Sequence, residues 1–222
     1  MKKSFNVVIA TAGRDTLQRM VDSIAPQLEE QDYLTIIWDC QPMSLQIDSN
    51  CKVISLHNPE PLGFWGHGSR NRWQDELPGD YFMNADDDDV YTKDAMSIVR
   101  ECCTEDKLYI FQFLYANSKI PEGDVIKVGN IGTPCGVYPK INKFPTWELR
   151  FGGDGEFYIE LAKMIPYQHI HKVIYSVKPP EDNNAIPEKE YKHCSCGVLA
   201  NMSYDEIFKT WRGYCHRCDK QL

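Results

Sequence analysis

Four consecutive aspartates, Asp86 to Asp89, are the residues of this chain best suited to chemistry. They follow a short apolar run, residues 80–85, that is typical of a buried strand. Carboxylates this close repel one another when they are shielded from water, so a folded chain keeps them ionised only beside counter-charge. Oxygen clusters suit Mg²⁺ or Mn²⁺, which keep positions open for phosphate oxygens. An acidic surface turn is the alternative, but the carboxyl end of a strand favours a ligand site.

Two more carboxylates stand beside glycines in residues 151–157, Phe-Gly-Gly-Asp-Gly-Glu-Phe, where a helix is expected to begin. Asp154 or Glu156 could act as a general base if an acceptor hydroxyl lay within hydrogen-bond reach. Asp154 could also cap the helix, and the two roles are compatible. Just before this segment, Trp147 could stack on a sugar face or pack in the core.

Paired cysteines near the end of the chain form a zinc-ribbon-like pattern. The predicted ligands of a structural Zn²⁺ are Cys194, Cys196, Cys215 and Cys218, with His193 and His216 as substitutes. All four positions would be filled by protein, which is typical of a structural ion. A cluster of ordinary thiols is the alternative. The chain has nine cysteines, and without a secretion signal this odd number argues against a disulfide framework.

Composition limits the classes of protein that this chain can be. Its 222 residues, 42% of them hydrophobic, suit one substantial domain with a small appendage. The formal net charge of −8 disfavours a broad electrostatic grip on nucleic acid or an anionic membrane. The apolar run before Thr11 is too short for a signal-peptide core or a membrane span, so we expect a cytoplasmic protein.

Strands and helices are expected to alternate along most of the chain, which predicts an α/β fold with a mostly parallel, Rossmann-like sheet flanked by helices. Short β-branched or aromatic runs predict strands at 5–10, 33–38, 52–56, 80–85, 107–115 and 171–177. Apolar periodicity and boundary signals predict helices at 15–28, 66–76, 92–102 and 156–163. The Gly- and Pro-rich section that runs to about residue 153 predicts hairpins and loops, and residues 178–188 read as a linker.

The order of these motifs resembles the GT-A glycosyltransferases, especially family 2-like nucleotide-sugar transferases, over roughly residues 4–178. Matching segments are the loop Ala10-Thr11-Ala12-Gly13-Arg14, the acid Asp39, Gly63 with the Arg70-Asn71 pair, and the run Asp86-Asp87-Asp88-Asp89 at the position of a D-x-D-D motif. The resemblance implies a GT-A domain at 1–180, followed by the zinc-ribbon-like segment at 189–222. It also implies donor-binding residues: Thr11, Ala12, Arg14, Asp39, Gly63, Arg70, Asp86 and Asp87.

The resemblance also implies roles at the reaction centre. Asp88 would bind a divalent metal that bridges the donor diphosphate, and Asp89 would orient that metal or bind it. Asp154 falls where inverting members carry the base, although the acid that usually precedes the base is Gly153 here. His171 is a candidate for the late histidine ligand, with a structural histidine as the alternative. Arg70 suits a phosphate or the donor sugar, or else a solvated helix face.

These matches imply a metal-dependent, inverting hexosyl- or pentosyltransferase that uses a nucleotide-sugar, expected to be UDP-linked. The expected acceptor is a glycan hydroxyl or, less favoured, a hydroxylated DNA base, as in some viral enzymes of infected host cells. One alternative is a nucleotidyltransferase, although the loop after the first strand has only one glycine and one arginine. Another alternative is a non-catalytic module that binds nucleic acid or protein through its zinc segment.

Overall fold

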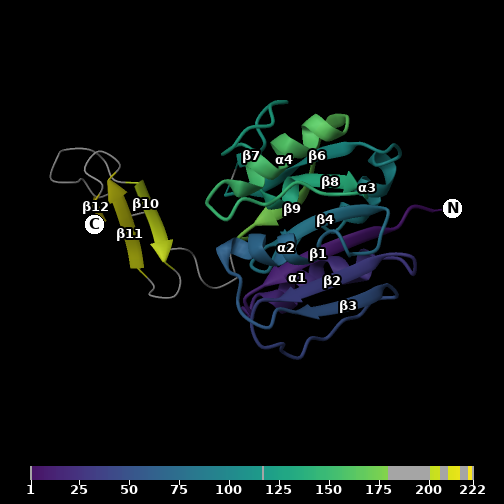
Figure 1. The fold of residues 1–222 in the computed structure, drawn as a ribbon, viewed down its shortest axis with the longest axis horizontal. Coiled ribbons are helices and arrows are strands. Elements are labelled where there is room, and N and C mark those ends of the chain that lie inside the picture. The colour runs from purple at the N-terminus through teal and green to yellow at the C-terminus, as the bar shows by residue number, and fades with distance from the viewer. Residues whose placement is uncertain (1, 117, 180–200, 206–209, 216–219, 222) are drawn as a thin grey trace. The chain divides into compact units, whose positions relative to one another are not determined.

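The computed structural model describes residues 2–116, 118–179, 201–205, 210–215 and 220–221. The chain forms two compact units, Met1–Pro179 and Pro180–Leu222. The first unit holds a nine-stranded sheet with helices on both faces (Figure 1). Among the described helices, none is long and apolar enough to cross a membrane.

One half of the sheet is parallel, with the strand order β3-β2-β1-β4. These strands are β1 (Phe5–Thr11), β2 (Tyr33–Trp38), β3 (Lys52–His57) and β4 (Tyr81–Asp86). All of β1 is buried, because helices cover both faces of the sheet around it. Since β1, β2 and β4 run the same way, their carboxyl ends meet at one edge of the sheet, where α/β folds place ligands.

The other half of the sheet is mixed. It contains β5 (Val90–Tyr91), β6 (Leu108–Tyr115), β7 (Ser118–Ile120), β8 (Gly136–Pro139) and β9 (Tyr167–Val177). Strand β8 lies antiparallel between β4 and β6, whereas β9 is parallel to β6. The predicted α/β fold is confirmed. The three short strands β5, β7 and β8 were not predicted from the sequence.

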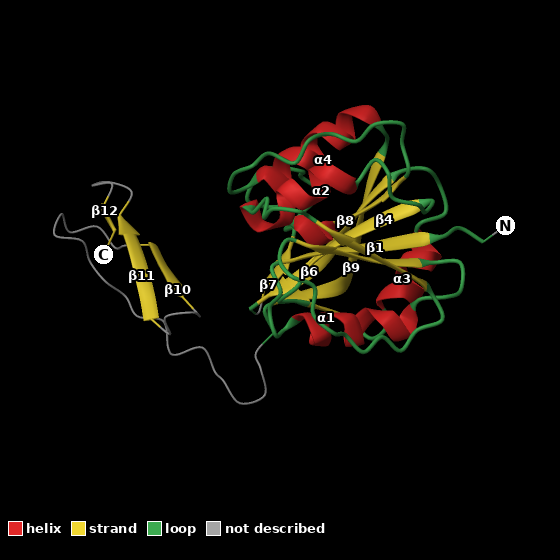
Figure 2. Cartoon of the chain, turned by 60° about the horizontal axis from the view of Figure 1, so that its bottom comes forward, coloured by secondary structure: helices red, strands yellow, loops and turns green. Residues whose placement is uncertain are grey.

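Helices cover the two faces of the sheet in pairs (Figure 2). Helices α1 (Leu17–Ile24) and α3 (Ala95–Cys102) lie on one face, and α2 (His67–Trp73) and α4 (Gly153–Met164) lie on the other. Short 3-10 turns occur at Ala25–Gln27, Phe64–Gly66 and Thr133–Cys135. Helix α1 is shorter than expected because Pro26 falls in the 3-10 turn that follows it.

The second unit contains a small antiparallel sheet of β10 (Asn201–Asp205), β11 (Thr210–Cys215) and β12 (Lys220–Gln221). Cys215 is the last residue of β11. The other predicted zinc ligands, Cys194, Cys196 and Cys218, lie outside the described residues, as do His193 and His216. The zinc site therefore stays a prediction from the sequence.

Candidate functional site

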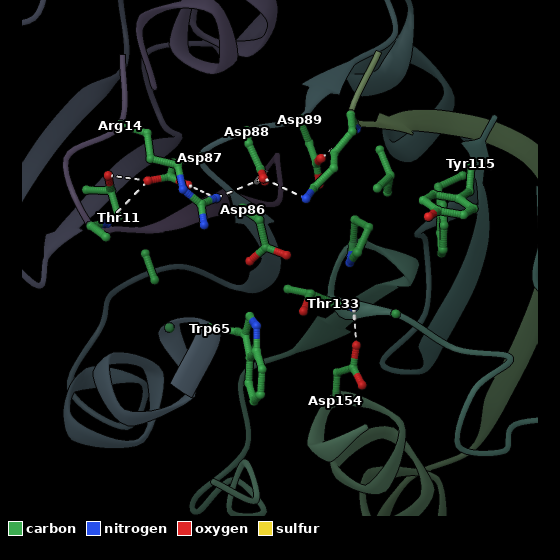
Figure 3. A pocket seen from close by; sticks show the side chains of 18 of the residues that line it. Thr11, Arg14, Trp65, Asp86, Asp87, Asp88, Asp89, Tyr115, Thr133 and Asp154 are labelled. Carbon is green, nitrogen blue, oxygen red and sulfur yellow. Dashed lines mark hydrogen bonds and ion pairs between the residues drawn. The ribbon is translucent and has the colours of Figure 1, made fainter. Parts of the chain in front are cut away.

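A cleft of about 530 Å³ opens at the edge of the sheet where β1, β2 and β4 end (Figure 3). Most of the residues predicted from the sequence line this cleft: Thr11, Ala12, Arg14, Asp39, Gly63, Asp86, Asp87, Asp88, Asp89 and Asp154. Arg70 does not line it but contacts Asp86, while Glu156 and His171 lie elsewhere. The fold thus brings together residues that lie far apart in the sequence, from Thr11 at the end of the first strand to Asp154 in α4.

Asp87 fixes the loop that follows β1. Its Oδ2 accepts hydrogen bonds from the Thr11 hydroxyl at 2.6 Å and the Ala12 amide at 3.2 Å. Its Oδ1 accepts a bond from Arg14 Nη1 at 2.9 Å. The side chain is buried and both of its oxygens have partners, so Asp87 holds the cleft wall in place.

Asp88 has two cationic neighbours in the cleft. Arg14 Nη1 lies 2.8 Å from its Oδ2, and Lys178 Nζ lies 3.5 Å from the same atom. Figure 3 shows Asp88 between Asp87 and Asp89 along the upper rim of the cleft, with ion pairs reaching it from both sides. Asp88 therefore lies beside positive groups that could also face a diphosphate.

Asp89 is buried at the end of the aspartate run, and its Oδ1 accepts a hydrogen bond from the Lys178 amide at 2.8 Å. Burial raises the pKa of Asp89 to about 8, and the nearby charges of Asp86 and Asp88 act in the same direction. In the absence of a bound cation, burial therefore favours the protonated form of this carboxyl. A bound cation would favour its ionised form.

Arg70 fixes the orientation of Asp86. Its Nη2 donates to Asp86 Oδ1 at 2.7 Å and to the Ala85 carbonyl at 2.8 Å, and its Nη1 donates to the Trp65 carbonyl at 3.0 Å. The side chain of Arg70 is 1% exposed, so the alternative of a solvated helix face is wrong. With Oδ1 held in this way, the Asp86 carboxylate points into the middle of the cleft (Figure 3).

Asp39 lies at the end of β2 and organises the loop that carries Gly63. Its carboxylate accepts hydrogen bonds from the Leu62 amide at 2.7 Å, the Gly63 amide at 2.6 Å and the Asn58 side chain at 2.9 Å. Burial opposes the ionisation of Asp39, but these bonds outweigh it and lower its pKa below the ordinary value. Asp39 therefore stays ionised at the cleft wall.

Asp154 lies across the cleft from the aspartate run (Figure 3). Its Oδ2 accepts a bond from the Thr133 amide at 3.1 Å, and its Oδ1 accepts one from the Gly155 amide at 2.8 Å. Burial raises the pKa of Asp154, despite those two hydrogen bonds. Helix α4 begins at Gly153 after the N-cap residue Gly152, so Asp154 is not the N-cap.

Glu156 lies in the first turn of the same helix, two residues after Asp154, and makes a different contact. It pairs with Arg150, and it lines neither this cleft nor the neighbouring cavity described next. Of the two carboxylates proposed as bases, only Asp154 faces the site.

A second cavity of about 300 Å³ adjoins the cleft and shares Asp86, Thr133, Asp154 and Trp65 with it. Two exposed aromatic side chains stand at this cavity: Trp65 is 62% exposed and Phe151 is 85% exposed. Neither was singled out from the sequence. Trp65 directly precedes the predicted helix 66–76, and no periodicity marks it as a surface residue.

Two residues that the sequence suggested for ligand binding, Trp147 and His171, do not line the cleft. Trp147 is fully buried and stacks on Phe157 with ring centroids 4.0 Å apart, so it belongs to the core and is not free to stack on a sugar. His171 is exposed, and its Nε2 lies 3.0 Å from Asp124 Oδ1, away from the aspartate run. Lys178, the residue that directly follows β9, reaches Asp88 instead.

The aspartate run fits a divalent cation that also uses ligands from outside the protein. Within the described ranges, no group of three or more His, Cys, Asp or Glu side chains is arranged to hold a metal ion alone. Mg²⁺ and similar hard cations are commonly bound by one or two carboxylates together with substrate phosphates and water. Asp88 and Asp89 offer hard oxygen ligands of that kind beside an open cleft.

This chain is similar to known proteins in its structure, whereas its sequence matches no family model and no curated protein. A solved structure of S. aureus TarS residues 1–349 with UDP-GlcNAc is similar, with a TM-score of 0.60, 14% identity and coverage of 85% of this chain. The Pyrobaculum calidifontis mannosyltransferase PcManGT, solved with GDP-Man and Mn²⁺, gives a TM-score of 0.57, 10% identity and 82% coverage.

Both of these proteins have the GT-A architecture, a mixed sheet between helices. The first unit has a GT-A fold. This chain spans 62% of the TarS fragment and 59% of the mannosyltransferase, so the GT-A unit corresponds to part of each. At such low identity the likeness shows the fold alone.

Proposed function

We propose that this protein is a metal-dependent, inverting glycosyltransferase that uses a nucleotide-sugar, with a UDP-sugar as the favoured donor. The observation that carries the proposal is one cleft with two chemically different sides. One side holds the aspartate run with Arg14 and Lys178, and the other holds Asp154. The resemblance of the fold to sugar transferases supports the same reading.

The donor would lie along the aspartate side of the cleft. Asp39 and the loop Thr11–Arg14 are proposed to hold the nucleoside, and Asp86, fixed by Arg70, to hold the ribose or the sugar. Asp88 and Asp89 would hold Mn²⁺ or Mg²⁺, which neutralises the charge that develops on the diphosphate when bound. Arg14 and Lys178 add positive charge to the same region.

The acceptor would approach from the side of Asp154. Its hydroxyl oxygen attacks the anomeric carbon of the donor sugar and forms the new C–O bond, while the bond from that carbon to the diphosphate breaks. The nucleoside diphosphate leaves with the bonding electron pair, and the hydroxyl proton passes to the Asp154 carboxylate. Burial makes this carboxylate more basic than an ordinary one, which suits a general base. A single displacement of this kind inverts the anomeric configuration.

Calorimetric titration with UDP, UDP-sugars and GDP-mannose, with and without Mn²⁺, tests the donor half of the proposal. Nucleoside diphosphate release in the same samples measures turnover. We expect Asp88→Asn to abolish the Mn²⁺-dependent part of donor binding. The matched control is Asp124→Asn, because Asp124 is an exposed carboxylate outside the cleft.

Three outcomes decide the matter. Donor binding that requires Mn²⁺ and is lost only in Asp88→Asn supports the proposal. Unchanged binding and turnover in a folded Asp88→Asn protein would contradict the metal role. The absence of binding by every nucleotide, in protein shown to be folded by circular dichroism, would reject the transferase reading as a whole.

A further inference from the structure

The cavity that adjoins the donor cleft has an aromatic corner of Trp65 and Phe151. Their ring centroids are 6.3 Å apart and their planes meet at 76°, so the two rings form an edge-to-face pair. Both rings are more than half exposed, although large aromatic side chains usually bury most of their surface. A ring-shaped ligand in this cavity would cover apolar surface that is otherwise left to water.

The backbone that presents Trp65 is held in an unfavourable conformation. The four residues Gly63, Phe64, Trp65 and Gly66 all have positive φ, at 63°, 54°, 54° and 79°. Residues with a side chain avoid this region, and each such residue costs about 1–2 kcal/mol. The Trp65 carbonyl accepts a bond from the buried Arg70, which helps to hold the loop. Strain of this kind tends to persist where a site requires it.

The charge of the second cavity selects against anions. Two carboxylates, Asp86 and Asp154, line it, and no lysine or arginine is among its lining residues within the described part of the chain. His67 also lines it, but burial lowers the pKa of that imidazole, and its Nδ1–H donates to the Glu148 carbonyl at 2.7 Å. Arg70 pairs with Asp86 but is buried and does not line the cavity, so a phosphate placed here would meet carboxylates and no exposed cation.

Resting on the function proposed above, we infer that this second cavity is the acceptor subsite and that it takes a neutral sugar ring. Such a ring has an apolar face that can lie on the Trp65–Phe151 corner and hydroxyls at its edge. Asp154 belongs to both cavities, so a hydroxyl of a ring seated on the aromatic corner can reach the carboxylate that takes its proton. A phosphorylated sugar or the phosphate backbone of DNA is disfavoured by charge.

The test combines binding and transfer on the full chain. Saturation-transfer NMR with methyl β-D-glucopyranoside and methyl α-D-mannopyranoside, without donor, measures the subsite alone. Donor turnover is then measured with water only, with these glycosides, with glucose 6-phosphate and mannose 6-phosphate, and with DNA that contains 5-hydroxymethylcytosine. The variant is Phe151→Ala, because Phe151 is exposed and lines only the second cavity. The control is Tyr167→Ala, an exposed aromatic residue outside both cavities.

We expect a neutral glycoside to bind and to accelerate turnover, its phosphorylated counterpart to do neither, and Phe151→Ala to lower kcat/KM for the glycoside by roughly tenfold. Tyr167→Ala should change neither glycoside binding nor donor turnover, because Tyr167 lines neither cavity. Glycoside binding that is unaffected by Phe151→Ala, or a preference for the phosphosugar or DNA, would overturn the inference. Phe151-dependent glycoside binding without any donor turnover would instead reject the proposed function and leave the subsite standing.

Discussion

Asp154 and Glu156 stand two residues apart, yet they have different surroundings. Asp154 faces the two cavities, whereas Glu156 pairs with Arg150. We therefore predict that Asp154→Asn lowers kcat/KM for sugar transfer by about 10²–10⁴-fold while the donor Kd stays the same, since a general base contributes about that much. Glu156→Gln is the matched control and should retain activity. The reverse pattern, measured by steady-state kinetics and calorimetry, would assign the base to Glu156.

The same residue predicts a pH dependence. A general base acts in its ionised form, so activity falls as the pH drops through its pKa. Because burial raises the pKa of Asp154, this fall should begin at a higher pH than for an ordinary carboxyl group. The measurement is kcat/KM against pH with a saturating metal concentration. Residual activity of Asp154→Asn should lack this limb, and an identical limb in that variant would show that another group titrates.

Asp89 links protein stability to pH in the metal-free protein. Its pKa is about 8 in the folded chain, above the ordinary value of about 4 for an aspartate in an unfolded chain. The folded state thus holds this proton more tightly, so the stability that it contributes is full below about pH 4 and is lost progressively as the pH rises to about 8. In the presence of a chelator, Asp89→Asn should lie closest to the wild type at pH of about 4 and melt several degrees higher at pH of about 9.

Thermal melts of both proteins at the two pH values test this prediction, with Asp124→Asn as the control for loss of an exposed charge. An equal difference in Tm between Asp89→Asn and the wild type at both pH values would show that the buried proton does not set the stability.

At the scale of elements, the 3-10 turn Phe64–Gly66 joins Gly63, which lines the proposed donor cleft, to α2. Gly66 has φ +79°, and a Cβ there would lie 2.6 Å from Ala10 Cβ and 3.0 Å from Arg70 Nη1. We predict that Gly66→Ala costs about 1–3 kcal/mol of stability and also weakens donor binding, because the added methyl displaces Arg70 from Asp86. Urea unfolding and donor titration measure the two effects.

The matched control is Gly123→Ala, because Gly123 has φ +68° and a Cβ there would meet no atom within 4 Å. It isolates the cost of the backbone conformation from the cost of the close contacts. Equal losses of stability and donor affinity in the two variants would mean that contact with Ala10 and Arg70 is not what Gly66 provides.

The strands of the parallel half could be predicted because each is a short, strongly apolar run. The strand predicted at 33–38 coincides with β2, and the acidic run does begin at the end of β4. Strands β5, β7 and β8 have two to four residues each, too few to show a period, and tertiary pairing alone defines them. The burial of Arg70 and Trp147 likewise depends on α2 packing beside α4, which local sequence does not encode.

The sequence predicts those residues of the candidate site that belong to recognisable motifs. The aspartates, Arg14 and Asp39 follow strands, and strand ends are where a sheet gathers ligand residues. Trp65, Phe151 and Lys178 could not be found in this way, because their roles come from loop conformations and exposure rather than from residue spacing.

At the scale of the whole molecule, the first unit has its own hydrophobic core, formed by residues of β1, α1, β2, β4 and β6 among others. We predict that a chain shortened after residue 182 still folds cooperatively and binds the donor with an unchanged Kd. The full chain should hold one equivalent of Zn²⁺ by elemental analysis, and the shortened chain none, because the predicted cysteine ligands lie beyond residue 182. Zinc that stays with the shortened chain would place the metal in the first unit instead.

The shared wall between the two cavities has a consequence for inhibition. Asp86, Thr133 and Asp154 line both spaces, so an occupant of one cavity lies next to an occupant of the other. A single compound that joins a nucleoside to a neutral ring through a short linker could therefore fill both cavities at once. Its two halves would bind with a high effective concentration for each other, so that two weak fragments make one tight ligand.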